Sequence, residues 1–183
     1  MRRALSMSAI LLSACASSQG SSAPPMPDQT FRIPASSGGA STTLAITSST
    51  TSSVKSVPAT AERIWSVLPA VYESLGIPIT DRDPAARTIG NTSYKVRRRL
   101  GDVPLSRYLD CGSTQGAPSA ESYEIVLSVT TGLQAGTSDS TRVSITVSAM
   151  GRPVFLSAEY VRCGSTGGLE KRFFETLNSK LRG

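Results

Sequence analysis

The residues of this 183-residue chain with the most chemical potential are its three cysteines, Cys15, Cys111 and Cys163. The chain has no histidine, which excludes hydrolase sites with a histidine base and zinc sites built on imidazole. Its glutamates lack the spacing of a paired general acid and base, and it has neither a Gly-rich phosphate loop followed by lysine nor a Gly-x-Ser-x-Gly sequence. The sequence therefore predicts no catalytic residue, no metal site, no cofactor and no enzymatic activity.

The first cysteine closes a segment with the features of an export signal. Arg2 and Arg3 precede an apolar run, residues 4–12, and small residues follow. The run is shorter than the roughly 20 residues that a bilayer-spanning helix needs, which favours a cleaved secretory signal. The sequence Leu-Ser-Ala-Cys, residues 12–15, resembles the lipobox of bacterial lipoproteins. This resemblance implies cleavage before Cys15 and lipid on that cysteine; the alternative is an ordinary signal with an incidental cysteine.

Lipidation of Cys15 would anchor the chain to a membrane. Ala16, and not aspartate, follows the cysteine, which resembles lipoproteins that are sorted to the outer membrane. We therefore expect a lipid-anchored protein of the cell envelope that faces the periplasm. Loss of Arg2 and Arg3 lowers the basic residues from 19 to 17 against 13 acidic ones, and this moderate charge on an exported protein argues against nucleic acid as a partner.

Cys111 and Cys163 remain as a pair when Cys15 carries lipid. A disulfide persists in an oxidising compartment, and each of the two cysteines is followed by Gly-Ser-Thr. Their wide spacing and the lack of further ligands disfavour a redox or metal motif. We expect a structural disulfide, with a free or functional thiol pair as the alternative.

Composition divides the chain into three parts. Residues 1–14 are expected to be the signal peptide, and residues 15–41 the lipidated cysteine with a flexible tether, because Ser, Gly, Pro and Ala dominate that stretch. Phe31 and Ile33 interrupt the tether. The remaining residues, 42–183, number about 140 and suffice for one domain.

The pattern of apolar residues predicts two helices. The first begins after Thr60 and ends at Gly76, with an apolar stripe. The second lies at the C-terminus and carries an apolar residue at every fourth position. The two stripes consist of Ile64, Leu68, Val71 and Leu75, widened by Trp65 and Tyr72, and of Leu169, Phe173, Leu177 and Leu181, with Phe174 beside them.

Alternating apolar and polar residues predict strands. The two clearest strands cover residues 122–130 and 142–149, and the Gly- and Ser-containing loop at 132–140 makes them a hairpin. Further strands are predicted at 42–47, 54–57, 77–80, 88–96 and 154–162, with a turn at 81–84. Period-two alternation indicates an antiparallel sheet with one buried face.

The order of these elements is strand, helix, several antiparallel strands and helix. It predicts an α+β fold in which two helices pack on one face of an antiparallel sheet. The segments 57–65, 72–78 and 81–90 resemble the opening of the helix-grip domains of BamC-like outer-membrane lipoproteins. That resemblance covers residues 42–182 and implies a helix-grip fold. It departs from the family in one respect, because BamC-like proteins have two such domains and this chain has room for one.

The densest charge run is a candidate binding segment. Its residues, with two nearby ones, are Lys95, Arg97, Arg98, Arg99, Arg107 and Tyr108. One interpretation is a solvated edge strand whose charges prevent aggregation. The other is a patch for lipid headgroups or for an acidic protein partner. The connection from residue 99 to 120 is long for an irregular loop, and such loops are often functional.

Two functions remain open. The first is a non-catalytic accessory or scaffold lipoprotein that works with an outer-membrane assembly or transport complex. The second is a module that binds a lipid or another apolar ligand between helix and sheet. A closed, filled interior would rule out a ligand between helix and sheet.

Overall fold

Two long neighbouring strands, β11 (Tyr123–Ala135) and β12 (Thr141–Pro153), form the centre of the structure. They pair antiparallel along their whole length, from Tyr123 opposite Pro153 to Ala135 opposite Thr141. Buried and more exposed residues alternate along both strands, as the sequence predicts. Because successive side chains of a strand point to opposite faces, this alternation gives the sheet one apolar face and one polar face.

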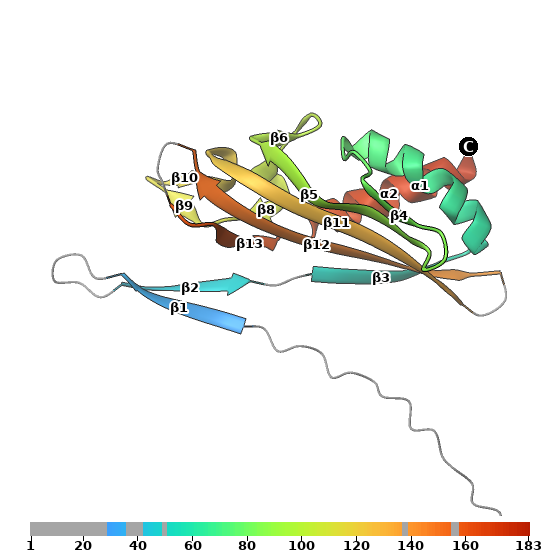
Figure 1. Cartoon of the computed structure of the whole chain (residues 1–183), viewed down its shortest axis with the longest axis horizontal. Helices are drawn as coiled ribbons and strands as arrows, with labels where there is room; N and C mark the ends of the chain where they lie inside the picture. Colours follow the sequence, from blue (N-terminus) through green and yellow to red (C-terminus); the bar gives the residue numbers. More distant parts are fainter. Residues whose placement is uncertain (1–28, 36–41, 49–50, 137–138, 155–157) are drawn as a thin grey trace, which may run out of the picture.

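The computed structural model describes residues 29–35, 42–48, 51–136, 139–154 and 158–183. Within them, seven strands form the main sheet, and two helices cover its apolar face (Figure 1). On one side of the β11–β12 pair, β5 pairs with β11, and β4 pairs with β5. On the other side, β3 and β13 pair with successive parts of β12, and β8 pairs with β13. The strands not yet bounded are β3 (Thr51–Val57), β4 (Asp81–Asp83), β5 (Thr88–Arg97), β8 (Leu109–Asp110) and β13 (Val161–Ser165). This is the predicted α+β class.

The first helix, α1 (Ala61–Leu75), has the predicted ends. The Thr60 side chain accepts a hydrogen bond from the Arg63 N–H at 3.3 Å, which satisfies a free donor of the first turn. Gly76 ends the helix with a φ of 73°, a left-handed conformation that glycine adopts without strain. The predicted stripe faces the sheet, with Ile64, Leu68 and Val71 among the fully buried residues.

The second helix, α2 (Gly168–Arg182), has Gly167 at its N-cap position, without a side-chain cap hydrogen bond. The Ser165 hydroxyl accepts from the Gly167 N–H and donates to the Glu170 carboxylate at 2.7 Å. The buried residues Leu169, Phe173, Phe174 and Leu177 face the core. The two helices meet where the rings of Tyr72 and Phe173 contact edge to face, with centroids 6.2 Å apart.

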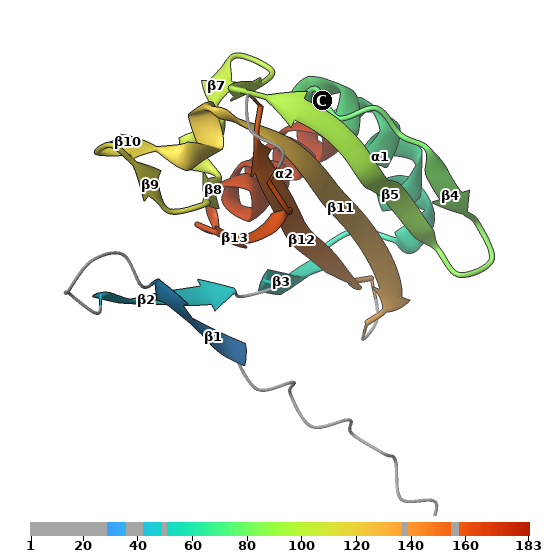
Figure 2. The ribbon, with the colours of Figure 1, turned by 60° about the vertical axis from the view of Figure 1, so that its left-hand side comes forward.

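The two N-terminal strands, β1 (Gln29–Ala35) and β2 (Thr42–Ser48), form a hairpin beyond β3 (Figures 1 and 2). The sequence predicts β2, but β1 falls inside the stretch predicted as a flexible tether. Phe31 and Ile33 of β1 are two residues apart, on either side of Arg32. This spacing is typical of a strand, but the Ser- and Gly-rich surroundings obscure it. Cys15, the signal peptide and the rest of the tether lie outside the described residues.

Two predictions for the segment between α1 and β5 are wrong. Residues 77–80 are an irregular link and not a strand, and the carbonyl of Pro78 accepts from the Asn91 side chain at 2.8 Å. The turn lies at 84–87 rather than 81–84, because the Asp83 carboxylate accepts from the N–H groups of Ala85 and Ala86.

The last strand also begins later than predicted, at Val161. Tyr160, just before it, donates its hydroxyl to Glu124 at 3.1 Å. This bond ties the residue to the side chain of another strand rather than to a backbone ladder.

The connection between β5 and β11 is long but ordered by short elements. It contains two small hairpins, β6–β7 and β9–β10, together with β8 and two 3-10 turns. Their bounds are β6 (Arg99–Leu100), β7 (Val103–Pro104), η1 (Leu105–Arg107), β9 (Ser113–Thr114), β10 (Ala117–Pro118) and η2 (Ser119–Glu121). Figure 2 shows this region gathered at one end of the sheet.

Tyr72 joins α1 to the centre of the sheet through a buried hydroxyl. The hydroxyl lies 2.9 Å from the Thr131 Oγ1 and donates to the Ile89 carbonyl at 3.1 Å. Burial raises the pKa of Tyr72 far above its ordinary value, so the group stays neutral. Because the ring also packs on Phe173, one side chain fixes the distance between both helices and the sheet.

We predict that Tyr72→Phe lowers the free energy of unfolding by about 1–2 kcal/mol, since it leaves buried oxygens without a donor. The matched control is Tyr94→Phe, because the partly exposed Tyr94 hydroxyl has no hydrogen bond among the described residues. It should change stability by less than about 0.5 kcal/mol. Urea unfolding measures both, and equal losses would contradict the role assigned to Tyr72.

Candidate functional site

Two of the predicted binding residues, Lys95 and Arg97, lie on the face of the sheet that the helices leave uncovered. Val96 between them is buried in the core, whereas both cations are exposed. Arg97 is opposite Glu124 of β11, and Lys95 is opposite Val126. We call the side of β5, β11, β12 and β13 away from the helices the open face; its charged residues are Lys95, Arg97, Glu124, Arg142, Arg152 and Arg162.

Two arginines far away in the sequence complete a cluster with Lys95 and Arg97. Arg152 of β12 is opposite Glu124, so it continues the row that Arg97 begins. In the next row, Arg162 of β13 is opposite Met150, which is opposite Val126. Adjacent strands are about 4.8 Å apart, so each row crosses about 10–15 Å of the surface.

Every charged residue of these four strands lies on the open face. Those strands contain five basic residues and a single acidic one, Glu124. Sequence reasoning found Lys95 and Arg97 from local charge density but missed Arg152 and Arg162, each isolated among uncharged neighbours. The alternation along β12 could have identified Arg152. It places Arg142 among the polar residues, and steps of two residues from Arg142 lead to Arg152.

Glu124 is held by neighbours on its own face. Arg152 donates to its carboxylate from Nη2 at 3.0 Å and from Nε at 3.2 Å, and Tyr160 donates at 3.1 Å. The hydrogen bond from Arg152 lowers the pKa of Glu124, with smaller contributions from Tyr160 and the charge of Lys95. The guanidinium of Arg152 also lies 4.9 Å from the centre of the Tyr160 ring. Lys95 and Arg97, by contrast, have no side-chain hydrogen bond among the described residues.

The other predicted arginines lie away from Lys95 and Arg97. Arg98 has a φ of 62° and turns the chain out of β5, while Arg99 donates to the Asp102 carbonyl within its own hairpin. Arg98 and Arg99 line a shallow cavity of about 450 Å³ with Ala117 of β10 and residues near it. Arg107, on η1, is exposed at the same end of the molecule. We call Arg98, Arg99, Arg107 and Ala117 the loop surface.

Tyr108 is not on that surface. It is 5% exposed, and its hydroxyl accepts a hydrogen bond from Arg172 of α2 at 2.7 Å. Arg172 also donates to Asp102 at 3.2 Å and lowers the pKa of that carboxyl. Tyr108 therefore joins the connection to α2 rather than presenting its ring to a partner.

A disulfide holds the connection to the sheet. The sulfur atoms of Cys111 and Cys163 are 2.04 Å apart, so the structure has the predicted bridge. Beside it, Thr166 accepts from the Gly168 N–H and donates to the Arg107 carbonyl at 2.8 Å. In the other Cys-Gly-Ser-Thr sequence, the Thr114 hydroxyl pairs with Ser119, so the two repeats make different contacts.

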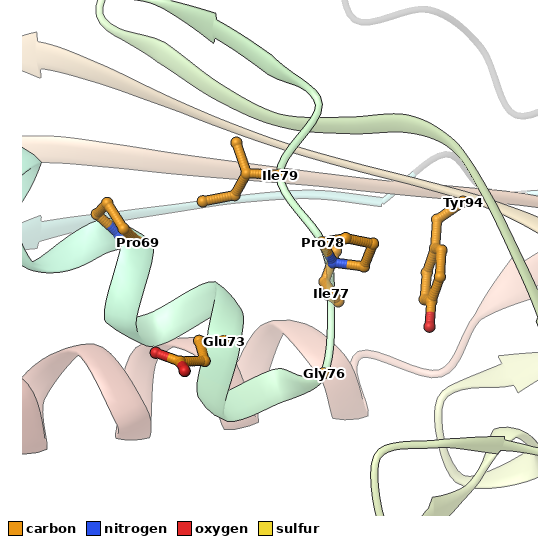
Figure 3. A pocket seen from close by; sticks show the side chains of 7 residues that line it. All are labelled: Pro69, Glu73, Gly76, Ile77, Pro78, Ile79 and Tyr94. Carbon is orange, nitrogen blue, oxygen red and sulfur yellow. The ribbon is translucent and has the colours of Figure 1, made fainter.

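The space between the helices and the sheet is filled by side chains. Ile64, Leu68, Tyr72, Phe173 and Leu177 are among its fully buried residues. The cavity shown in Figure 3 lies outside this core, at the edge of the sheet. It has a volume of about 490 Å³ and is lined by Pro69, Glu73, Gly76, Ile77, Pro78, Ile79 and Tyr94.

The described residues contain no group of three or more potential metal ligands among their Cys, Asp and Glu side chains. Over the same part of the chain, no helix has the length and apolar character needed to cross a membrane. Neither the protein-family models nor the curated proteins give a match to this chain. The interpretation of these surfaces therefore depends on the chain's own residues.

We predict that Cys111→Ala/Cys163→Ala lowers the free energy of unfolding by about 4 kcal/mol, because the bridge closes a loop with a sequence separation of 52. Chemical reduction of the wild type should reproduce the loss, and urea unfolding measures both. Peptide mapping of envelope-isolated protein should show Cys111 joined to Cys163. Free thiols at both positions would contradict the structural role.

Proposed function

We propose that this chain is a lipid-anchored, non-catalytic protein of the cell envelope. It acts as an accessory or scaffold component of an outer-membrane assembly or transport complex. The Leu-Ser-Ala-Cys sequence that ends at Cys15 supports the anchor and the periplasm-facing location. The Cys111–Cys163 bridge is consistent with an oxidising compartment.

The observation that carries a scaffold role is the filled interior. A ligand-binding module of this architecture needs space between helix and sheet, and here Tyr72 and Phe173 occupy that space and contact each other. The protein therefore acts through its surface.

A binding module for an apolar ligand remains the second candidate because of the cavity in Figure 3. Pro69, Ile77, Pro78 and Ile79 give it an apolar lining at the edge of the sheet. Such a ligand would bind outside the core, where solvent also reaches it, and this disfavours tight burial of a lipid chain.

The loop surface is the proposed contact for an acidic protein partner. Arg98 and Arg107 are exposed and have no side-chain hydrogen bond among the described residues. The disulfide, together with the bonds from Arg172 to Tyr108 and Asp102, holds this region in place. A rigid surface loses less conformational entropy when a partner binds.

We predict that Cys15→Ser releases the protein from membranes into the soluble envelope fraction, because the acyl chains that hold it are then absent. Fractionation followed by immunodetection measures the shift, and Ser74→Ala, which keeps both the lipobox and the disulfide, is the control. Unchanged membrane association of Cys15→Ser would contradict the anchor.

A photo-crosslinking amino acid at Ala117 tests the partner surface in intact cells. We expect a crosslink to an envelope protein, and Arg98→Glu/Arg107→Glu should reduce its yield roughly tenfold by charge repulsion. The same amino acid at Ser74, exposed on α1, is the matched control and should give no such product. Absence of any crosslinked protein at Ala117 would contradict an accessory role at the loop surface.

A further inference from the structure

We propose that the open face binds directly to an anionic membrane surface, so that the domain lies flat on lipid headgroups instead of projecting from its anchor. This inference rests on the proposed function in one respect only, since the lipid on Cys15 brings the domain to a membrane. It assigns a second, separate binding surface to the protein.

The first support is the one-sided distribution of charge. Lys95, Arg97, Arg152 and Arg162 are all exposed on one end of the open face, around a single carboxylate. That carboxylate, on Glu124, already accepts hydrogen bonds from Arg152 and Tyr160. The positive charges of this face thus outnumber the negative ones, as binding to anionic headgroups requires.

The second support is the shape and chemistry of the surface between the cations. Met150, 43% exposed, and Val126 occupy the row between Lys95 and Arg162. The rest of the β11–β12 pair presents mostly small hydroxyl side chains on this face, namely Ser128, Thr130, Ser144, Thr146 and Ser148. The long basic side chains at one end can therefore reach the lipid headgroups, while Met150 enters the boundary between the headgroups and the acyl chains.

The helix side of the molecule carries acidic and aromatic side chains beside its cations. Arg87 pairs with Glu62, Arg172 with Asp102 and Lys171 with Glu175. Lys55 lies 4.7 Å from the centre of the Phe174 ring, and Arg63 donates to the Leu181 carbonyl. Acidic residues thus accompany many of the cations on that side, whereas the four strands of the open face carry five basic residues against Glu124 alone, so the open face is the more basic surface.

The direct test measures binding of the mature chain with Cys15→Ser to phosphatidylcholine vesicles with and without phosphatidylglycerol. Sedimentation should show binding only with phosphatidylglycerol, and added salt should weaken it. Lys95→Gln/Arg97→Gln should lower the partition coefficient about 25-fold, which is about fivefold for each charge. Lys180→Gln/Arg182→Gln removes the same charge from the exposed end of α2 and should lower it by less than about twofold.

A second variant reports which face touches the lipid. Met150→Trp in a Trp65→Phe background places the only tryptophan on the open face, and its emission should shift to the blue when phosphatidylglycerol vesicles are added. Trp65 of the wild type, which lies on the helix side against Arg82, should show no shift. Equal losses in the two charge variants, binding without phosphatidylglycerol, or no shift at Met150→Trp would overturn the inference.

The two proposals fail separately. Loss of vesicle binding with an intact crosslink at Ala117 would overturn the membrane contact and leave the scaffold role in place. Vesicle binding without any crosslink at Ala117 would overturn the accessory role at the loop surface and leave the membrane contact in place.

Discussion

The structure depends on the strict alternation of side chains across the paired strands β11 and β12. Their register, from Tyr123 opposite Pro153 to Ala135 opposite Thr141, sends Ile125, Leu127 and Val129 toward the helices and the intervening residues away from them. A shift of one residue would exchange the two faces. The same register that builds the core therefore also brings Arg152 beside Glu124 and Arg97, so the open face is a direct consequence of how the core is paired.

Three ties attach the rest of the chain to this sheet. Tyr72 bonds α1 to β11 and β5, the Cys111–Cys163 bridge attaches the β5–β11 connection to β13, and Arg172 attaches that connection to α2. Each tie joins segments distant in sequence. Together they attach the region that carries the loop surface to the sheet that carries the open face.

Local patterns predicted the long elements well. Thr60 and Gly76 mark the ends of α1, and the alternation around Val129 and Ile145 identifies the central hairpin, because these signals come from neighbouring residues. The site was harder to predict. Arg162 joins Lys95 only through the pairing of four strands, and the Tyr108 hydroxyl is held by Arg172, 64 residues later in the chain. A short strand such as β4 depends on the turn that the Asp83 carboxylate forms and on pairing with β5. Neither produces a periodic pattern in the sequence.

The central claim is that the open face, and not the helix side, meets the membrane. The most direct measurement is NMR of the lipidated protein in nanodiscs with ¹³C-methyl methionine and a paramagnetic label on the lipid headgroups. The account predicts strong broadening of the Met150 methyl signal and little broadening of a reporter introduced on α2 by Ser179→Met. Equal broadening of both signals, or stronger broadening at the α2 reporter, would contradict it.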